Sequence, residues 1–355
     1  MKIWIATGGT GGHVYPAIAV ALELVDHGHT VLISSDGRTM EMIKKSKPAA
    51  AGTVFIWAAG VGAKSKIKQV FALFKIAVSS VALMLRWIFF RPDRVVSFGG
   101  YASVPAVVAA WVWNIPTLMH EQNAAIGRAN EFTLKMVGTL MTSFPSVTGI
   151  PGSVSDDKKL KTVYTGLPVR KEFTVTEYQT PKTEFKILVT GGSLGATILD
   201  EIVPAALATL PTATRKKIFI VHQTRPESVE TLRSEYTKMG VRANVLSFIH
   251  DMADQMKATS LVIGRSGAST VVELQTLGRP AILVPLGINP DQAANAAAFA
   301  KTGGGFDIPQ EKFTAKWLAA TLAELFENPA RLKKMADKAR VPNNASRKIL
   351  EEIVK

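Results

Sequence analysis

Two glycine-rich segments stand at corresponding places in the two halves of the chain. Residues 7–12 read Thr-Gly-Gly-Thr-Gly-Gly and residues 190–195 read Thr-Gly-Gly-Ser-Leu-Gly, each after a short apolar run. A glycine turn that opens a helix lets backbone N–H groups approach a phosphate, and the helix dipole favours its charge. Neither segment has the spacing of a dinucleotide fingerprint or a Walker A loop. They indicate either tight helix-on-strand turns or, because both halves carry one, phosphate or sugar binding.

Candidate acid–base groups follow the first turn and a later strand. His13 comes directly after the glycines, where a neutral imidazole could act as a general base; a histidine satisfied by local backbone is the alternative. His120, Glu121, Gln122 and Asn123 follow a predicted strand at its carboxyl end. Position 124 is alanine, so a zinc-binding HExxH motif is excluded. We expect this polar segment to line a site.

A second constellation lies in the other half of the chain. Residues 266–273 form a small-residue turn that leads into a helix. Thr270 and Glu273 fit a capping box; alternatively, the N–H groups of the turn bind a diphosphate while Glu273 accepts hydrogen bonds from ribose hydroxyls. Asp291 and Gln292 begin a later helix, where they could cap it or bind sugar hydroxyls.

Alternating strands and helices must position these residues. Short apolar runs separated by helical patterns predict buried parallel strands at 3–6, 31–34, 94–97, 117–120, 186–190, 217–221, 244–247, 261–264 and 281–285. A stretch rich in Gly, Pro, Ser and Lys at 149–159 interrupts the pattern. The sequence predicts an α/β fold with two Rossmann-like, doubly wound parallel-sheet domains facing a cleft, at 1–160 and 161–340. A C-terminal helix at about 341–355 is predicted to pack back on the first domain.

Composition narrows the classes of function. The 355 residues include no cysteine, which excludes disulfides, thiolate metal sites and a cysteine nucleophile. A formal charge of +14 calls for an anionic partner, and no nucleic-acid-binding signature is present. The first residues lack the features of a signal peptide, and Lys75 and Arg86 interrupt the longest apolar stretch. We therefore expect a cytoplasmic protein without a spanning helix.

One segment is both basic and apolar. No acidic residue occurs between Glu41 and Asp93, although lysines and arginines are frequent there. An apolar stripe recurs at helical spacing at Ile67, Phe71, Phe74, Val78, Val81, Leu85 and Ile88. A core-facing helix is the simpler interpretation of this stripe. Because the opposite side is also apolar, an interfacial helix on anionic lipid is the alternative.

Five motifs in one order identify a family. The segments GGTGGH at 8–13, HEQN at 120–123, GGSLGA at 191–196, GASTVVEL at 267–274 and the residue Gln292 closely resemble the MurG family. Its members are UDP-GlcNAc:lipid-linked muramyl-pentapeptide transferases of peptidoglycan synthesis. The resemblance extends over nearly the whole chain. It implies the GT-B fold, inverting GlcNAc transfer, and a peripheral location on the cytoplasmic face of the bacterial membrane.

The resemblance also assigns roles to individual residues. The donor UDP-GlcNAc is expected to contact the second domain and the rim of the first, through Thr10, Gly11, Gly12, Asn123, Arg170, Ser193, Ile249, Ser269, Thr270, Glu273 and Gln292. The acceptor lipid I is expected to contact Gly8, Gly9, Thr10, Gly11, Gly12 and Tyr101. Catalytic roles fall to His13, Asn123 and Glu121, with His13 as the base. Membrane contact falls to Lys64, Lys66, Lys68, Phe71, Phe74, Lys75 and Trp87.

Cofactors and departures complete the expectation. No Asp-x-Asp motif is present to hold a metal for the donor, so we expect no tightly bound cofactor, with Mg²⁺ entering only with the substrate diphosphates. The family has Asp two residues before the Gln that matches Gln292, and a further polar residue after it. Pro290 and Ala293 stand there instead, which changes part of the predicted GlcNAc contact set.

Three other functions fit parts of the sequence. UDP-sugar 2-epimerases share the two-domain architecture and bind the same donor, but HEQN would then have no obvious role. A related lipid glycosyltransferase that makes galactolipids is a closer competitor. A basic peripheral membrane adaptor would explain the charge, yet it would leave both glycine turns and Glu273 without a role.

Overall fold

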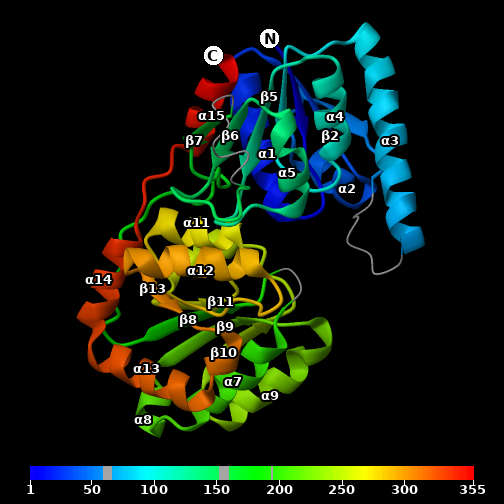
Figure 1. Ribbon diagram of the computed structural model, residues 1–355. Coiled ribbons are helices and arrows are strands. Elements are labelled where there is room, and N and C mark those ends of the chain that lie inside the picture. Colours follow the sequence, from blue (N-terminus) through cyan, green and yellow to red (C-terminus); the bar gives the residue numbers. More distant parts are fainter. Residues whose placement is uncertain (59–65, 152–159, 193–194) are drawn as a thin grey trace. The chain divides into compact units, whose positions relative to one another are not determined.

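Parallel sheets organise both halves of the chain. The computed structural model describes residues 1–58, 66–151, 160–192 and 195–355 (Figure 1). One unit comprises Met1–Arg170 and Asn343–Lys355, and the other comprises Lys171–Pro342. All strand neighbours are parallel in the registers of both sheets, and helices lie on both faces. This arrangement confirms the predicted α/β class with two doubly wound units.

The first unit contains a seven-stranded sheet with the order β3-β2-β1-β4-β5-β6-β7. Its strands are β1 (Lys2–Ala6), β2 (Thr30–Ser35), β3 (Gly52–Phe55), β4 (Arg94–Ser97), β5 (Thr117–Glu121), β6 (Thr139–Thr142) and β7 (Lys161–Tyr164). Its helices are α1 (Gly11–Asp26), α2 (Gly37–Ser46), α3 (Lys66–Phe89), α4 (Val104–Val112), α5 (Arg128–Thr133), the 3-10 turn η1 (Leu134–Met136) and α15 (Ala345–Val354).

Alternation along β1 explains why both faces of the first sheet are covered. Ile3 and Ile5 point to one face, where α1 and α15 pack. Trp4 and Ala6 point to the other, where they pack with residues of α3 and α4. Side chains on successive strand residues alternate between faces, so a strand apolar at every position must be buried on both.

The second unit contains a six-stranded sheet with the order β10-β9-β8-β11-β12-β13. Its strands are β8 (Phe185–Thr190), β9 (Ile218–Gln223), β10 (Arg242–Leu246), β11 (Leu261–Gly264), β12 (Ala281–Leu283) and β13 (Gly305–Asp307). Its helices are α7 (Thr197–Ala208), α8 (Thr212–Arg215), α9 (Val229–Lys238), α10 (Met252–Ala258), α11 (Ala268–Leu277), α12 (Pro290–Thr302), α13 (Ala315–Glu327) and α14 (Pro329–Ala339). Single 3-10 turns are η2 (Pro226–Ser228) and η3 (Gln310–Lys312). Helices α7, α9 and α13 cover one face of this sheet, and α11 and α12 cover the other (Figure 1).

Each sheet has one point where its strand order reverses direction. In the first sheet β1 lies between β2 and β4, and in the second β8 lies between β9 and β11. Ligands of open parallel sheets bind in the crevice at the carboxyl ends of the strands beside such a point. The two glycine-rich turns follow β1 and β8, so each stands at a switch point.

The boundary between the units differs from the predicted one. Strand β7 pairs with β6 in the first sheet, so the first unit continues to Arg170 instead of ending at residue 160. Four short strands at or next to the sheet edges were not predicted: β3, β6, β7 and β13. Helix α15 belongs to the first unit, where its apolar side joins the core beneath α1.

Candidate active site

Two backbone turns approach each other at the switch point of the first sheet. A Cβ on Gly100 would lie 2.5 Å from the carbonyl oxygen of Gly8, and Gly100 has φ +76°. Gly9 has φ +91°, in the left-handed region that favours glycine. In the described part of the chain, Thr10 precedes α1 without a side-chain hydrogen bond to the helix. The glycines thus let the backbone at the start of α1 reach the crevice, as a phosphate site requires.

His13 lies on the first turn of α1 and contacts the segment that follows β5. Its Nδ1 is 2.8 Å from Oε1 of Gln122. Gln122 is buried, and its Nε2 donates to the carbonyl oxygens of Phe98 and His120, at 2.9 and 3.1 Å. His13 is half-buried. The structure therefore brings the predicted base and the HEQN segment together, 109 residues apart in sequence.

Glu121 holds the loop that follows β5. Its carboxylate accepts hydrogen bonds from the backbone N–H groups of Asn123 and Gly127, both at 2.9 Å. It also accepts from the side-chain amides of Asn123 at 3.2 Å and Asn130 at 2.7 Å. Glu121 is buried, so these donors compensate for its removal from water. The geometry gives this predicted catalytic residue a positioning role, which is to fix Asn123 beside His13's partner Gln122.

Asn130 is a site residue that the sequence analysis missed. It lies on α5 with 3% of its surface exposed, and its side-chain oxygen is buried without a hydrogen-bond partner among the described residues. A Cβ on Gly99 would lie 3.0 Å from this oxygen and 3.4 Å from Nδ1 of His13. An asparagine inside a short helix is a weak sequence signal, since Asn is unfavourable there without a local cap. Only the fold shows that Asn130 and His13 both lie beside Gly99.

Tyr101 and Arg170 take different surroundings in the first unit. Tyr101 is half-buried and follows Gly99 and Gly100, which have φ values of +77° and +76°. It packs against the small cluster of Ile76, Val104 and Ala129. The guanidinium of Arg170 lies over the ring of Tyr15, 5.3 Å from its centroid, so α1 orients this cation.

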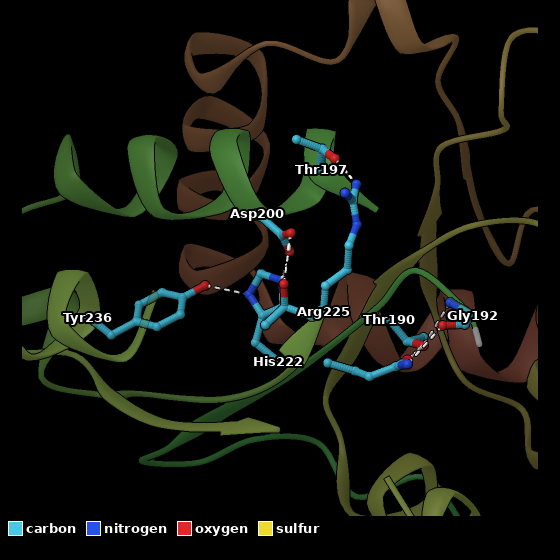
Figure 2. A network of polar contacts seen from close by, with 9 residues as sticks. Thr190, Gly192, Thr197, Asp200, His222, Arg225 and Tyr236 are labelled. Carbon is cyan, nitrogen blue, oxygen red and sulfur yellow. Dashed lines mark hydrogen bonds and ion pairs between the residues drawn. The ribbon is translucent and has the colours of Figure 1, made fainter. Parts of the chain in front are cut away.

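The glycine turn of the second unit is tied to two neighbouring strands (Figure 2). Thr190 at the end of β8 donates to Oε1 of Gln223 at 2.7 Å, and Nε2 of Gln223 donates to the carbonyl oxygen of Gly192 at 2.8 Å. Gly192 has φ +77°, and a Cβ on Gly191 would lie 2.3 Å from the backbone of Gly195. Ser193, predicted to contact the nucleotide, lies outside the described residues.

A buried polar cluster anchors the start of α7 behind this turn (Figure 2). His222 lies between Tyr236, whose hydroxyl is 2.7 Å from Nδ1, and Asp200, whose carboxylate is 3.1 Å from Nε2. Thr224 donates to the second oxygen of Asp200 at 2.8 Å. Burial lowers the pKa of His222, against the opposing effect of Asp200. These contacts connect α7, β9 and α9, and they hold the helix that opens at the glycine turn.

The observed start of helix α11 contradicts the capping-box interpretation of Thr270 and Glu273. The helix begins at Ala268 with Gly267 at the N-cap position, so Thr270 lies inside the first turn and cannot cap it. Ser269 and Thr270 are partly exposed at this helix start, and Glu273 is buried at 9% exposure. The turn is also anchored from α12: Ser266 donates to the carbonyl oxygen of Gln292 at 2.7 Å. The capping explanation for Thr270 and Glu273 is therefore wrong.

The start of α12 also assigns its cap to an unpredicted residue. Asn289 is the N-cap, and its side chain accepts from the backbone N–H of Asp291 at 3.2 Å. Gln292 accepts from the backbone N–H of Leu286 at 3.0 Å, which fixes its side-chain oxygen and points its amide nitrogen away from that bond. Pro290 occupies the first helical position, which suits proline.

Ile249, which the sequence predicts to contact the donor, is buried at 4% exposure between β10 and α10. Its neighbour Phe248 is 56% exposed and stands edge-on to His250, with ring centroids 4.8 Å apart. Across the described residues, no group of three or more His, Cys, Asp or Glu side chains is arranged to hold a metal ion.

Helix α3 buries a different face from the one predicted. The stripe Ile67, Phe71, Phe74, Val78, Val81, Leu85 and Ile88 is exposed along its whole length. The buried face consists instead of Ala72, Ile76, Ser79, Ser80, Leu83 and Trp87. Small residues on that face let α3 lie close to the alanine-rich helix α4, which explains why the larger side chains point outward. The core-face interpretation is therefore wrong.

Some of the predicted membrane-contact residues are exposed on α3 and others are not. Phe71, Phe74 and Lys68 are exposed, and the ammonium of Lys75 lies 4.9 Å from the ring centroid of Trp57. Trp87 is fully buried against Trp4, so its predicted membrane role is wrong. Lys64 and the side chain of Lys66 lie outside the described residues. By length and composition alone, Ile67–Phe89 could cross a membrane, which is weak evidence for a span.

Comparison with protein families places the chain in a class. Residues 3–142 match the glycosyltransferase family 28 N-terminal domain, and residues 186–353 match the glycosyltransferase family 28 C-terminal domain. Two parallel-sheet units with glycine turns at their switch points, matched by both domains of one family, define a glycosyltransferase.

Individual relatives narrow this class. A curated relative from Paramagnetospirillum magneticum is 40% identical over 351 residues, covering 95% of this chain and 91% of its own; it is a UDP-N-acetylglucosamine–N-acetylmuramyl-(pentapeptide) pyrophosphoryl-undecaprenol N-acetylglucosamine transferase. The crystal structure of Acinetobacter baumannii MurG is similar with a TM-score of 0.79 at 30% identity over 99% of both chains. The chain therefore belongs to the MurG family of these transferases.

A more distant structure shares only the fold. UDP-GlcNAc 2-epimerase from Neisseria meningitidis, solved with UDP-GlcNAc bound, is similar with a TM-score of 0.70 at 16% identity over the full length of both chains. At this identity the likeness supports the common two-unit fold and carries no argument about activity.

Proposed function

We infer that this protein transfers GlcNAc from UDP-GlcNAc to the C4 hydroxyl of MurNAc in lipid I, with inversion, forming lipid II. The observation that carries the inference is membership of the MurG family over 95% of the chain. By this reaction the protein contributes to peptidoglycan synthesis and cell wall biogenesis, on which cell shape and cell division depend.

The donor is assigned to the second unit. Ser269 and Thr270 stand at the start of α11, where helix N–H groups would bind the diphosphate, while Glu273 binds ribose hydroxyls. Backbone at Ile249 would bind uracil, and Gln292 would present its amide nitrogen to the GlcNAc hydroxyls. The segment at 191–195 would add backbone N–H groups at the departing diphosphate, where negative charge develops, and Arg170, the last residue of the first unit, would add positive charge there. Support comes from the start of α11 and the segment after β8, which follow the two strands that flank the switch point, and from the loss of the capping alternative.

The acceptor is assigned to the first unit. Residues 8–12 would bind the lipid I diphosphate, with Tyr101 beside them. His13 would remove the proton of the attacking hydroxyl, a contribution of typically 10²–10⁴-fold. Asn123, held by Glu121, would orient sugar hydroxyls. The proposal includes no tightly bound cofactor, and Mg²⁺ would enter as the counterion of the substrate diphosphates.

Membrane attachment is assigned to the exposed face of α3. A continuous apolar surface of this length is unusual on a soluble monomer, and Lys68, Lys75 and Arg86 lie on the same helix. Because the opposite face of α3 packs on α4 and the sheet, we propose that the helix lies along the cytoplasmic surface of an anionic membrane instead of spanning it. Vesicle binding should weaken with salt. If a variant with Lys64, Lys66 and Lys68 changed to Glu bound anionic vesicles as well as the natural protein, this assignment would be lost.

One assay separates the rival activities. Labelled UDP-GlcNAc is incubated with and without a lipid I analogue, and UDP release and sugar products are measured. The proposed function predicts UDP release that depends on the acceptor, with a disaccharide product. Isomerisation without acceptor would instead identify a UDP-sugar 2-epimerase, and transfer to a different lipid would identify another glycosyltransferase of the fold.

A single substitution tests the base. His13→Ala should lower kcat by about 10²–10⁴-fold, because only proton removal is lost. Binding of UDP-GlcNAc, measured by calorimetry, should not change. Near-normal turnover in this variant would rule out His13 as the base.

A further inference from the structure

The hydrogen bonds of Gln122 determine which nitrogen of His13 carries the proton. The Nε2 amide group of Gln122 faces two carbonyl oxygens, those of Phe98 at 2.9 Å and His120 at 3.1 Å. A flipped amide would place a carbonyl oxygen against both of these acceptors. The orientation is therefore fixed, and Oε1 must be the atom that faces His13.

An acceptor at Oε1 requires a donor on the imidazole. Nδ1 of His13 lies 2.8 Å from Oε1, so Nδ1 carries a proton in this contact. In the neutral imidazole the second nitrogen, Nε2, then holds the lone pair. Nε2 has no hydrogen-bond partner within the described residues. The ring thus offers to a ligand the atom that accepts a proton.

His120 supports this arrangement from behind. Its Nε2 is 2.9 Å from the carbonyl oxygen of Gly166, so Nε2 is the protonated nitrogen and Nδ1 is an acceptor. That acceptor lies 3.2 Å from Nε2 of Gln122, which gives the Gln122 amide a third reason to keep its orientation. His120 is fully buried, and burial lowers its pKa to about 4, so the ring stays neutral near pH 7.

Gly99 leaves room beside the ring of His13, next to its contact with Gln122. Gly99 has φ +77°, and a Cβ there would lie 3.4 Å from Nδ1 of His13. The same Cβ would lie 3.0 Å from the side-chain oxygen of Asn130, so a larger residue at position 99 would crowd Asn130 and contact the His13 ring. A carboxylate often takes the position of the orienting group behind a catalytic histidine. Here the position is held by a neutral amide, which fixes the tautomer without adding a charge to the ring.

We propose that Gln122 is a positioning residue for the glycosyl transfer, holding His13 as the Nδ1–H tautomer so that Nε2 takes the proton of the acceptor hydroxyl. This inference rests on the proposed function for its catalytic part. Its structural part concerns the resting protein alone. The O–H proton passes to Nε2 as the oxygen bonds to the anomeric carbon and the diphosphate leaves, and His13 becomes a cation whose Nδ1–H still donates to Gln122.

The first experiment reads the tautomer directly. Long-range ¹H–¹⁵N correlation spectra of the full-length protein, assigned with His13→Ala, should show His13 with Nδ1 protonated and His120 with Nε2 protonated. A wild-type His13 protonated mainly at Nε2 would overturn the proposal without any variant of Gln122. In Gln122→Met the His13 ring should gain the Nε2–H form.

The second experiment is a double-mutant cycle on turnover. Gln122→Met should lower kcat by roughly 10- to 100-fold with the KM for UDP-GlcNAc unchanged, because a wrong tautomer removes the base and leaves the donor site intact. In a His13→Ala background the same change should alter kcat by less than about twofold. Gln255→Met, which replaces an amide bonded to Asp251 on the second unit, is the matched control and should behave as wild type.

The outcomes separate this inference from the proposed function. An equal loss from Gln122→Met with and without His13 would overturn it, because Gln122 would then act by another route. A Gln122→Met enzyme with kcat within about twofold of wild type would do the same. Near-normal turnover of His13→Ala would remove the base from the proposed function, while the tautomer read by NMR would still decide the structural part.

Discussion

At the scale of the residue, Glu121 shows how a polar motif can be essential to a site without touching a substrate. Its two oxygens accept four hydrogen bonds from the loop that follows β5. Removing such a buried acceptor leaves several donors without partners, which costs more than the bonds themselves contribute. Residue types in the HEQN segment predicted chemistry, but the division between positioning and reacting groups came from these contacts.

His120 leads to a pH-dependent prediction. Its pKa is lowered from 6.5 to about 4, mainly by burial, so the unfolded chain binds a proton more readily than the folded one. Stability should therefore fall as pH decreases from about 6.5 towards 4, by about 3 kcal/mol for this group. Urea unfolding of wild type and His120→Asn at several pH values measures it, and the variant should show a flatter dependence in this window.

A control for this measurement is His250→Asn, which changes an exposed histidine of the other unit. It should keep the wild-type dependence on pH. If His120→Asn retained the full wild-type slope, burial of the neutral His120 ring would not be a source of acid sensitivity. The comparison uses slopes because His120→Asn also loses the hydrogen bond to Gly166 at every pH.

Some site residues were predictable from sequence and others were not. His13 was recognisable because it follows a glycine turn, and the structure does place it beside HEQN. Asn130 was not, because its approach to Glu121 and Gly99 depends on how α5 folds over β5. The predicted capping box at Thr270 was wrong for a local reason. The helix already begins at Ala268, two residues before Thr270, and Gly267 is its N-cap residue.

At the scale of the element, α3 shows the limit of hydrophobic periodicity. Both of its faces are apolar, so the pattern could not tell which face meets the sheet. Residue size decided it, because Ala72, Ser79 and Ser80 allow close packing that Phe71 and Phe74 would prevent. Strands followed the same logic: β4 and β11, apolar and central, were predicted with their observed bounds, whereas short marginal strands such as β3 and β13 carry too few apolar residues to be recognised.

The exposed face of α3 yields a quantitative expectation. Phe71 and Phe74 are 53% and 54% exposed, and their transfer into lipid would be lost in the double variant Phe71→Ser, Phe74→Ser. Vesicle affinity should fall roughly 10- to 100-fold, since burying a whole aromatic side chain contributes about 1.5–3 kcal/mol and only about half of each ring is exposed. Sedimentation with vesicles containing anionic lipid measures the change, and the melting temperature should stay near that of wild type.

Phe55→Ser is the matched control, because Phe55 is an equally apolar side chain of the same unit and is 60% exposed on β3. It should bind vesicles as wild type does. A comparable loss in this control would show that exposed aromatic side chains in general, and not the α3 face, govern binding. Unchanged binding of the double variant would contradict the interfacial assignment.

At the scale of the whole molecule, the last helix belongs to the first unit. Ile349, Leu350 and Ile353 of α15 are buried in the core formed with α1 and β1. The chain therefore passes from one unit to the other twice, after Arg170 and after Pro342. In the sequence, the second unit is therefore inserted between the last strand of the first unit and its final helix.

Loss of α15 packing should weaken the first unit specifically. Ile353→Ala removes a side chain with 0% exposure, and large-to-small changes of this kind cost about 2–4 kcal/mol. Tryptophan fluorescence during urea unfolding reports this unit, since five of the six tryptophans (Trp4, Trp57, Trp87, Trp111 and Trp113) lie in it. The adjacent Val354→Ala, at 42% exposure, should change stability by less than about 0.5 kcal/mol. Equal stability of both variants would show that α15 is not part of the folded core.

Because the chain crosses twice between the units, it can be truncated or circularly permuted only at certain positions. Met1 and Lys355 both lie at the amino-terminal ends of strands in the first sheet. The carbonyl oxygen of Met1 accepts a hydrogen bond from Thr30 at the start of β2, and Lys355 lines a pocket with the first residues of β4 and β5. A fragment that stops at Arg170 would expose the α15 binding surface, whereas a circular permutant that begins at Asn343 and joins Lys355 to Met1 would encode each unit without interruption. In this permutant only one segment of the chain would connect the two units. Comparing its turnover with that of the natural protein would show what the second connection contributes.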